Sequence, residues 1–357
     1  MRTLQKMIYT LLILLVVLAL GVVAFVNQPS FGRNPRGERL ARIQKSAHYK
    51  NGHFENELPT TTMTGDKSTV RALWEFLTVH PKNLRPDGPV PTVKTDLHAL
   101  PKDKDFMVWF GHSAYLLQLS GKRILVDPAL LSGSPVSFFN KPYEGTDLYK
   151  LQDMPDVDYL VISHDHWDHL DYKTVKALQK RIKYVVTPLG IGEHFEYWGF
   201  DKKQLIELDW HDRFSRDGFE IDCLPARHFS GRGLVPNKTL WGSFMVKTPD
   251  HKTIYIGGDS GHSTHFKQIG KNYPNITLAI LENGQYDEDW NQIHTMPREL
   301  AQEMRELGAQ TYVTVHHSKY TLAKHAWDEP LQVEKDAAQQ ANAHLEVLTI
   351  GQPLEIK

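Results

Sequence analysis

Residues 163–170 read Ser163-His-Asp-His-Trp-Asp-His-Leu170, which places three histidines and two aspartates within six consecutive positions. The apolar run 157–162 before this stretch has the pattern of a strand, and 172–180 after it has helical spacing, so we predict a strand-to-helix loop. Imidazole and carboxylate groups are the ligands that zinc and similar metals prefer, whereas a polar surface turn needs no such set. The stretch therefore predicts half of a two-metal hydrolase centre. Its ligands would be His164 and His166 for one ion, and Asp168 and His169 for the other.

The remaining ligands of such a centre are expected at the ends of later strands, because functional loops gather there. Three candidates directly follow or end predicted strands, namely His228, Asp259 and His316. They complete a set of seven, with three histidines on one metal, Asp-His-His on the other and Asp259 between them. His317 could equally point into the site, and the pattern alone does not choose between it and His316.

Strand patterns dominate the chain from residue 106 onward and are interspersed with helical spacing. Gly111 and Gly121 mark turns between the first of these strands. Such an order is typical of an α/β fold in which helices cover the sheets. We predict strands at 106–110, 114–119, 123–126, 157–162, 183–186, 204–208, 219–224, 240–247, 253–256 and 311–315, and helices at 68–77, 172–180 and 297–307.

The composition is that of an ordinary globular protein. The 357 residues are 41% hydrophobic, which is enough for a full-sized core. Charged residues make up 23% and the net charge is -1, which argues against a nucleic-acid binder, because such proteins carry a basic excess. The single cysteine, Cys223, rules out an intrachain disulfide framework, and we expect it to pack in the core. The sequence allows a homodimer without fixing the oligomeric state.

The N-terminus departs from this average, since residues 7–26 are apolar and carry no charge. About 20 apolar residues suffice to cross a bilayer as a helix. A cleaved signal peptide is the alternative, but 24–26 is a poor small-residue cleavage site and no lipoprotein cysteine follows. We predict a membrane anchor at 1–28, an extended segment at 29–100 that wraps the domain, and a hydrolase domain at 101–357.

Charges on the two sides of the apolar run give conflicting indications of its orientation. Counted alone, they favour a cytoplasmic domain, yet a large C-terminal domain can be translocated regardless of such charges. We expect a single-pass protein with an extracytoplasmic catalytic domain. The basic residues are Arg2 and Lys6 before the run, and Arg33, Arg36, Arg39, Arg42 and Lys45 after it.

The order of these motifs resembles the metallo-β-lactamase superfamily, whose hallmark His-x-His-x-Asp-His lies here at 164–169. Within that superfamily the chain is similar to the N-acylphosphatidylethanolamine-hydrolysing phospholipase D branch, over residues 104–332. Two further segments, 31–43 and 282–286, look like the bacterial members of this branch. The stretches that carry the likeness are 109–113, 126–128, 162–172, 206–210, 240–243, 257–261 and 315–320.

The resemblance implies an αβ/βα sandwich with two zinc ions between the sheet edges. It favours His316 over His317 and places His294 near the substrate phosphate, although a surface position at a helix start is the alternative for His294. We also expect His112 and Asp127 to orient ligands or loops. The implied ligands are His164, His166 and His228 for one zinc, Asp168, His169 and His316 for the other, and Asp259 for both.

The implied activity is that of a membrane-associated zinc phosphodiesterase. Two zinc ions lower the pKa of a water bound between them, and the bridging hydroxide can attack phosphorus. The expected substrates are N-acyl phosphatidylethanolamine-like phospholipids, and the products are phosphatidic acid and an N-acylethanolamine. A lactonase or β-lactamase is the alternative enzyme class, and a metal-binding or membrane scaffold is the alternative without catalysis. Residues 317–320 differ from the Trp-Gly-Thr-Phe of animal members, and 131–150 match nothing in the branch, so we expect substrate preference to differ.

Overall fold

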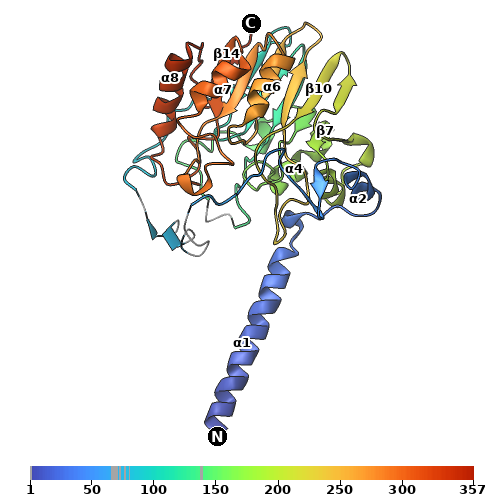
Figure 1. Ribbon diagram of the computed structural model, residues 1–357, viewed down its shortest axis with the longest axis vertical. Helices are drawn as coiled ribbons and strands as arrows, with labels where there is room; N and C mark the ends of the chain where they lie inside the picture. Colours follow the sequence, from blue (N-terminus) through green and yellow to red (C-terminus); the bar gives the residue numbers. More distant parts are fainter. Residues whose placement is uncertain (1, 66–70, 72–73, 76–77, 80, 137–139) are drawn as a thin grey trace.

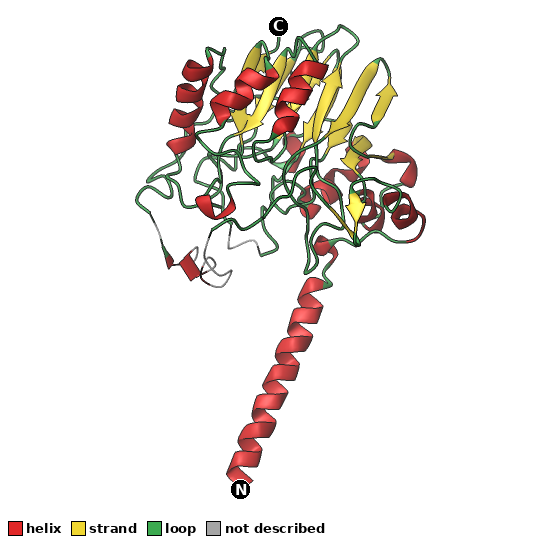
Figure 2. Ribbon diagram, viewed as in Figure 1, coloured by secondary structure: helices red, strands yellow, loops and turns green. Residues whose placement is uncertain are grey.

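Two β-sheets packed face to face, with helices on both outer faces, form the body of the molecule in the computed structural model (Figure 1, Figure 2). The structure describes residues 2–65, 71, 74–75, 78–79, 81–136 and 140–357. A long N-terminal helix projects from one end of this body, and the C-terminus lies at the opposite end (Figure 1). The predicted αβ/βα sandwich is confirmed.

Within the described residues, the first sheet has seven strands in the order β15-β3-β4-β5-β6-β7-β8. Strands β15 to β5 pair antiparallel in this order, and β5 to β8 pair parallel. The bounds are β3 (Phe106–Trp109), β4 (Tyr115–Leu119), β5 (Lys122–Val126), β6 (Val157–Val161), β7 (Ile182–Pro188), β8 (Leu205–Leu208) and β15 (Pro353–Glu355).

The second sheet, counted over the same described ranges, has six strands in the order β14-β13-β12-β11-β10-β9. Its strands β12, β13 and β14 pair parallel, and the others pair antiparallel. The bounds are β9 (Arg213–Arg216), β10 (Phe219–Leu224), β11 (Ser243–Lys247), β12 (Thr253–Ile256), β13 (Leu278–Glu282) and β14 (Thr311–Val315).

Apolar side chains alternate between two cores along the inner strands, because successive residues of a strand point to opposite faces. In β13, Leu278 and Ile280 lie in the core between the sheets, whereas Ala279 and Leu281 pack against the outer helices. Helices α4 and α5 cover the first sheet, and α6, α7 and α8 cover the second. Their bounds are α4 (Tyr172–Leu178), α5 (Gly192–Tyr197), α6 (Thr264–Asn272), α7 (Leu300–Leu307) and α8 (Glu329–Ala341).

Most predicted elements lie where expected, with ends shifted by a few residues. The strand expected at 240–247 begins only at Ser243, because Leu240 N donates to Leu189 O and Gly242 N to Ser163 O instead of joining the sheet. In the two large sheets, three strands (β9, β13 and β15) were not predicted, and neither were three of the covering helices (α5, α6 and α8). Short 3-10 helices lie at η1 (Pro29–Phe31), η2 (Leu151–Asp153), η3 (Gln179–Arg181), η4 (Lys202–Gln204) and η5 (Glu288–Trp290).

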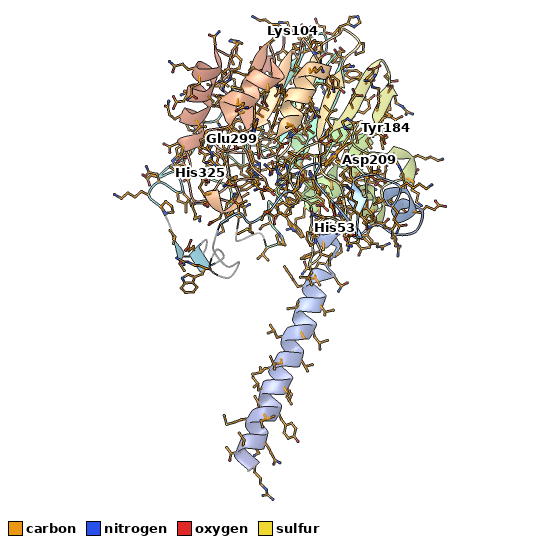
Figure 3. All side chains as sticks on the ribbon, in the orientation of Figure 1. His53, Lys104, Tyr184, Asp209, Glu299 and His325 are labelled. Carbon is orange, nitrogen blue, oxygen red and sulfur yellow. The ribbon has the colours of Figure 1, made fainter. Side chains whose placement is uncertain are left out.

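The N-terminal helix α1 (Arg2–Val26) has no buried residue and is long and apolar enough to cross a membrane. Figure 3 shows its side chains projecting outward along its length. Exposing so much apolar surface to water is unfavourable, whereas the acyl chains of a bilayer would solvate it. The helix is therefore suited to anchor the chain in a membrane.

The segment 29–100 is not extended throughout, contrary to the prediction. It contains helix α2 (Gly37–Ile43) and a short hairpin of β1 (Tyr49–Lys50) and β2 (His53–Phe54). The helix expected at 68–77 falls largely outside the described residues.

Helix α2 is held against the domain by arginine side chains and one apolar residue, and Arg42 donates to the Glu207 carbonyl at 2.7 Å. The Arg39 guanidinium donates to Glu193 and Glu207, each at 2.7 Å, and Ile43 is fully buried in the core between the sheets. A seven-residue helix has little stability alone, so these contacts explain why it forms here.

Chemistry-bearing residues follow the carboxyl ends of strands from both sheets. Asp127 follows β5, the 163–170 stretch follows β6, Asp259 follows β12, and His316 follows β14. Loops outside the carboxyl ends of parallel strands are where such folds place their sites. The two sheets thus bring distant parts of the chain to one edge of the sandwich.

Candidate metal centre

Three histidines converge at one end of this edge. His164 Nε2 lies 2.9 Å and His228 Nε2 3.2 Å from the same atom, Nδ1 of His166. Burial lowers the pKa of all three, so each ring is neutral at pH 7 and keeps a lone pair. Three neutral imidazole nitrogens that converge on one point are the donor set that a zinc-like metal takes, so the arrangement favours a metal.

A second group contains Asp168, His169 and His316, together with His112. His112 Nε2 lies 2.8 Å from Asp168 Oδ2 and holds that carboxylate, which agrees with its expected orienting role. His316 lies at a left-handed φ of 72°, an unusual conformation for a side chain of this size, at the end of β14. His317 faces away from the group and contacts Thr314 and Ser318.

Asp259 lies between the two groups. Its Oδ2 is 3.1 Å from His169 Nε2 and 3.8 Å from His164 Nε2, and its Oδ1 is 3.2 Å from His316 Nδ1. Gly258 makes this approach sterically allowed, because it has a φ of 63° and a Cβ there would lie 2.9 Å from Ser163 Cβ. The seven side chains predicted as ligands are therefore brought together.

Hydrogen bonds on the outer side of the rings fix their orientation. Asp127 Oδ2 accepts from His169 Nδ1 at 2.9 Å, and the Ile293 carbonyl accepts from His228 Nδ1 at 2.7 Å. Each bond leaves Nε2 of its ring directed at the cluster, which is how partners outside a metal site prepare histidine ligands. Ser113, which the sequence analysis did not single out, contacts His316 Nδ1 at 2.7 Å.

His294 adjoins both groups and forms a pair with Glu282. Its Nδ1 lies 2.9 Å from Glu282 Oε2, and its ring lies 5.0 Å from that of His228 and 5.5 Å from that of His316. Burial raises the pKa of Glu282 to about 7, while His294 opposes this. Burial lowers the pKa of His294, but Glu282 more than compensates and raises it. The pair therefore holds a proton near neutral pH.

A cavity of about 370 Å³ opens beside the cluster. Its lining combines predicted ligands, among them Asp259, with large apolar side chains. The polar lining residues include His166, Asp168, Asp259, His294 and His316, and the apolar ones are Met63, Phe229, Trp290, Ile293 and Leu322.

Comparison with known proteins matches residues 122–317 to the β-lactamase superfamily domain. The chain belongs to the β-lactamase superfamily. One relative, an uncharacterized protein of Mycobacterium tuberculosis, is 35% identical over 319 residues, covering 87% of this chain and 85% of the relative. Another, the N-acyl-phosphatidylethanolamine-hydrolyzing phospholipase D 1 of Caenorhabditis elegans, is 32% identical over 233 residues, covering 61% of this chain and 65% of the relative.

Solved structures show the same superfamily fold. A metallo hydrolase from the archaeon Ignicoccus hospitalis has a TM-score of 0.54 at 20% identity, covering 71% of this chain and 99% of that protein. The superfamily, the fold and the hydrolase class predicted from the sequence are thus confirmed.

The residues of this superfamily member fit a metal centre. Two buried atoms at the cluster, His169 Nε2 and Asp259 Oδ1, form no hydrogen bond with the residues that the structure describes, although each has a ring or carboxylate atom within 3.2 Å. Leaving such atoms unpaired in a protein interior is costly, and a cation bound between them would satisfy both. The imidazole and carboxylate donors are those of a zinc-like metal.

Asp165 and Trp167, the two x positions of the His-x-His-x-Asp-His hallmark, connect this loop to the rest of the molecule. Asp165 is buried, with its Oδ2 3.0 Å from His194 Nε2, and its Oδ1 accepts from Gly231 N. Trp167 packs edge-on against Phe31, with ring centroids 4.8 Å apart. The predicted loop is therefore fixed in place by the N-terminal segment and by the 231–236 region.

Proposed function

We propose that the chain is a zinc-dependent phosphodiesterase that hydrolyses N-acyl phosphatidylethanolamine-like phospholipids to phosphatidic acid and an N-acylethanolamine. The observation that carries the proposal is the cavity, because residues of the His/Asp cluster and large apolar side chains line it together. A phospholipid has the matching construction, with an anionic phosphodiester beside acyl chains. The C. elegans relative, whose name states this activity, supports the choice of substrate.

In this proposal the clustered side chains hold two zinc ions. When bound, the zinc ions lower the pKa of a bound water and neutralise charge that develops on the phosphate oxygens. One ion would be held by His164, His166 and His228, the other by Asp168, His169 and His316, and both by Asp259.

His294 supplies the proton that the leaving group needs. Its Nδ1 is occupied by Glu282, which leaves Nε2 available in the cavity that the residue lines. As water attacks phosphorus it releases one proton to solvent, the bond between phosphorus and the ethanolamine oxygen breaks, and Nε2–H of His294 donates its proton to that oxygen. Glu282 keeps the ring protonated for this step.

A membrane location follows from the same proposal. Helix α1 would hold the cavity near the lipid that it binds, with the catalytic domain on the extracytoplasmic side. Protease digestion of intact cells tests the orientation, because an extracytoplasmic domain is degraded and a cytoplasmic one is protected.

The activity is tested with the full chain in vesicles that contain N-acyl phosphatidylethanolamine, with zinc or with a chelator. We expect zinc-dependent release of phosphatidic acid and N-acylethanolamine, measured by mass spectrometry. The His166→Ala variant should be inactive. The His344→Ala variant is a matched control, because His344 is exposed and lies outside the cluster.

Two results would contradict the proposal. If neither product forms with zinc, the lipid substrate is wrong, and turnover of a lactone or a β-lactam would identify the alternative enzyme class. If elemental analysis of active protein finds one metal or none per chain, the assignment of two ions is wrong.

A further inference from the structure

The loop at residues 231–236, here called the tip loop, carries apolar side chains that the described part of the chain does not cover. Leu234 is 80% exposed and Val235 is 53% exposed. A single exposed leucine needs no explanation, since all proteins have some. Two neighbouring exposed apolar residues, Leu234 and Val235, form a small apolar surface that is suited to contact a membrane or another apolar partner.

The base of the tip loop is fixed, so its apolar end is held outward. Asn237 N donates to Ser230 O at 2.9 Å, and Ser230 N donates to the Asn237 side chain. Between them Arg232 is buried, and its guanidinium donates to the carbonyls of Ser30 and Asp165. The backbone next to Leu234 is therefore anchored inward, and the leucine cannot fold back onto the domain without breaking these bonds.

The tip loop lies next to the point where α1 joins the domain. Leu234 and Val235 line a cavity of about 240 Å³ together with Val26, the last residue of α1, and Phe31. The apolar surface of α1 thus continues onto the tip of the loop. If α1 crosses a bilayer, the bilayer surface lies at this end of the molecule (Figure 1).

Basic side chains lie near the apolar tip. Arg33 and Lys238 line the same cavity. Lys238 Nζ also donates to Gly52 O, and the Arg33 guanidinium lies 3.9 Å from Glu193. An apolar tip beside basic side chains matches the interface of a bilayer, where acyl chains lie beneath anionic headgroups.

We propose that the tip loop is a second membrane contact, in which Leu234 and Val235 insert among the acyl chains beside α1. Arg33 and Lys238 lie at the level of the headgroups and contact anionic lipid. The proposal rests on α1 being a membrane anchor and does not depend on which substrate the enzyme hydrolyses.

The test is possible because the single cysteine of the chain is inaccessible to labels. Cys223 is fully buried, so a cysteine introduced at the surface can be labelled selectively with an environment-sensitive fluorophore. Three variants of the full chain are compared in vesicles of phosphatidylcholine and phosphatidylglycerol: Leu234→Cys, Leu15→Cys within α1, and Val347→Cys. Val347 is the control position and is 49% exposed. It lies two residues after Leu345, which pairs with Tyr312 near the start of β14. His316 follows the other end of that strand.

Insertion predicts a blue-shifted emission for the labels at Leu234 and Leu15, and loss of that emission when lipids with a spin label on the acyl chain are included. The label at Val347 should show neither. Because a fluorophore is itself apolar, a label at the exposed Pro236→Cys is also measured with and without Leu234→Glu. We expect Leu234→Glu to keep the loop out of the bilayer, so that the label at position 236 loses its blue shift and emits as it does in water.

The outcomes are separable. If the label at Leu15 is quenched and that at Leu234 is not, the tip loop stays in water and the proposal is wrong, although the anchor stands. If neither is quenched, both the anchor and the tip-loop contact are wrong. If Leu234→Glu leaves the emission at position 236 unchanged, Leu234 does not drive insertion. None of these readings involves activity, so failure of the phosphodiesterase assignment would be seen separately.

Discussion

Replacing Glu334 by glutamine should stabilise the protein at neutral and alkaline pH. Glu334 lies on α8, is 1% exposed and accepts a hydrogen bond from Thr314 Oγ1, while its Oε1 has no partner among the described residues. Burial raises the pKa of this carboxyl from 4.5 to about 7. The charged form is therefore unfavourable in the folded state, and glutamine removes the charge while keeping an oxygen for Thr314.

The size of the effect follows from the pKa difference between the folded and unfolded states. Each pKa unit corresponds to about 1.4 kcal/mol, so a shift from 4.5 to about 7 amounts to roughly 3 kcal/mol. The folded state binds the proton more tightly, so the wild type loses this stability as pH rises from about 4.5 to about 7, the interval between the two pKa values. The Glu334→Gln variant should match the wild type at the acid end of this range and exceed it by about 3 kcal/mol at pH 8.

Urea unfolding of the full chain in detergent micelles, at several pH values and constant zinc, measures the difference between the two proteins. Metal binding affects both in the same way and cancels in the comparison. Glu38→Gln, at an exposed position of α2, is the control and should differ little from the wild type at any pH. A constant difference between pH 5 and pH 8, or a less stable Glu334→Gln at pH 8, would refute the reasoning.

Three further changes test the site and its supports. His228→Ala should remove about half of the bound zinc and abolish hydrolysis, measured by elemental analysis and product release; unchanged metal content would exclude His228 as a ligand. Arg39→Ala should destabilise the chain by about 1–3 kcal/mol in urea unfolding, because Glu193 and Glu207 lose the guanidinium that bonds both, although Arg36 still lies near Glu193. Gly258→Ala should cost about 1–3 kcal/mol and weaken zinc binding, since its Cβ would clash with Ser163 Cβ and displace the loop that carries Asp259; normal stability would show that the loop adapts.

The sequence predicted the fold well where strands are apolar and buried. Strands β4 and β6 show this, because nearly all of their residues lie in the two cores. It failed for β9, which is an edge strand of mostly exposed polar residues, Arg213–Arg216, and carries no periodic apolar signal. It also missed β13, although the apolar residues Leu278–Leu281 end directly in Glu282. That missed strand is why Glu282 was not recognised as the partner of His294.

The candidate site was predicted more completely than the fold, because its residues are chemically distinctive. Spacing identified the seven clustered side chains, but it could not choose between His316 and His317. That choice depends on the backbone, since the left-handed φ of His316 directs the ring of His316 to Asp259 and the ring of His317 to Thr314. Ser113 could not have been found from the sequence, because a serine is common and only its contact with His316 makes it significant.

The connection between α1 and the domain is short and tightly packed. Phe25 near the end of α1 packs against Phe31 with ring centroids 5.1 Å apart, and Phe31 packs against Trp167 within the hallmark stretch. A domain joined in this way cannot move away from the membrane, so it stays at a fixed height above the bilayer. For a lipid substrate, encounter then occurs by diffusion in two dimensions. The rate would follow the mole fraction of substrate in the leaflet, so that added inert lipid slows the enzyme although the amount of substrate per volume is unchanged.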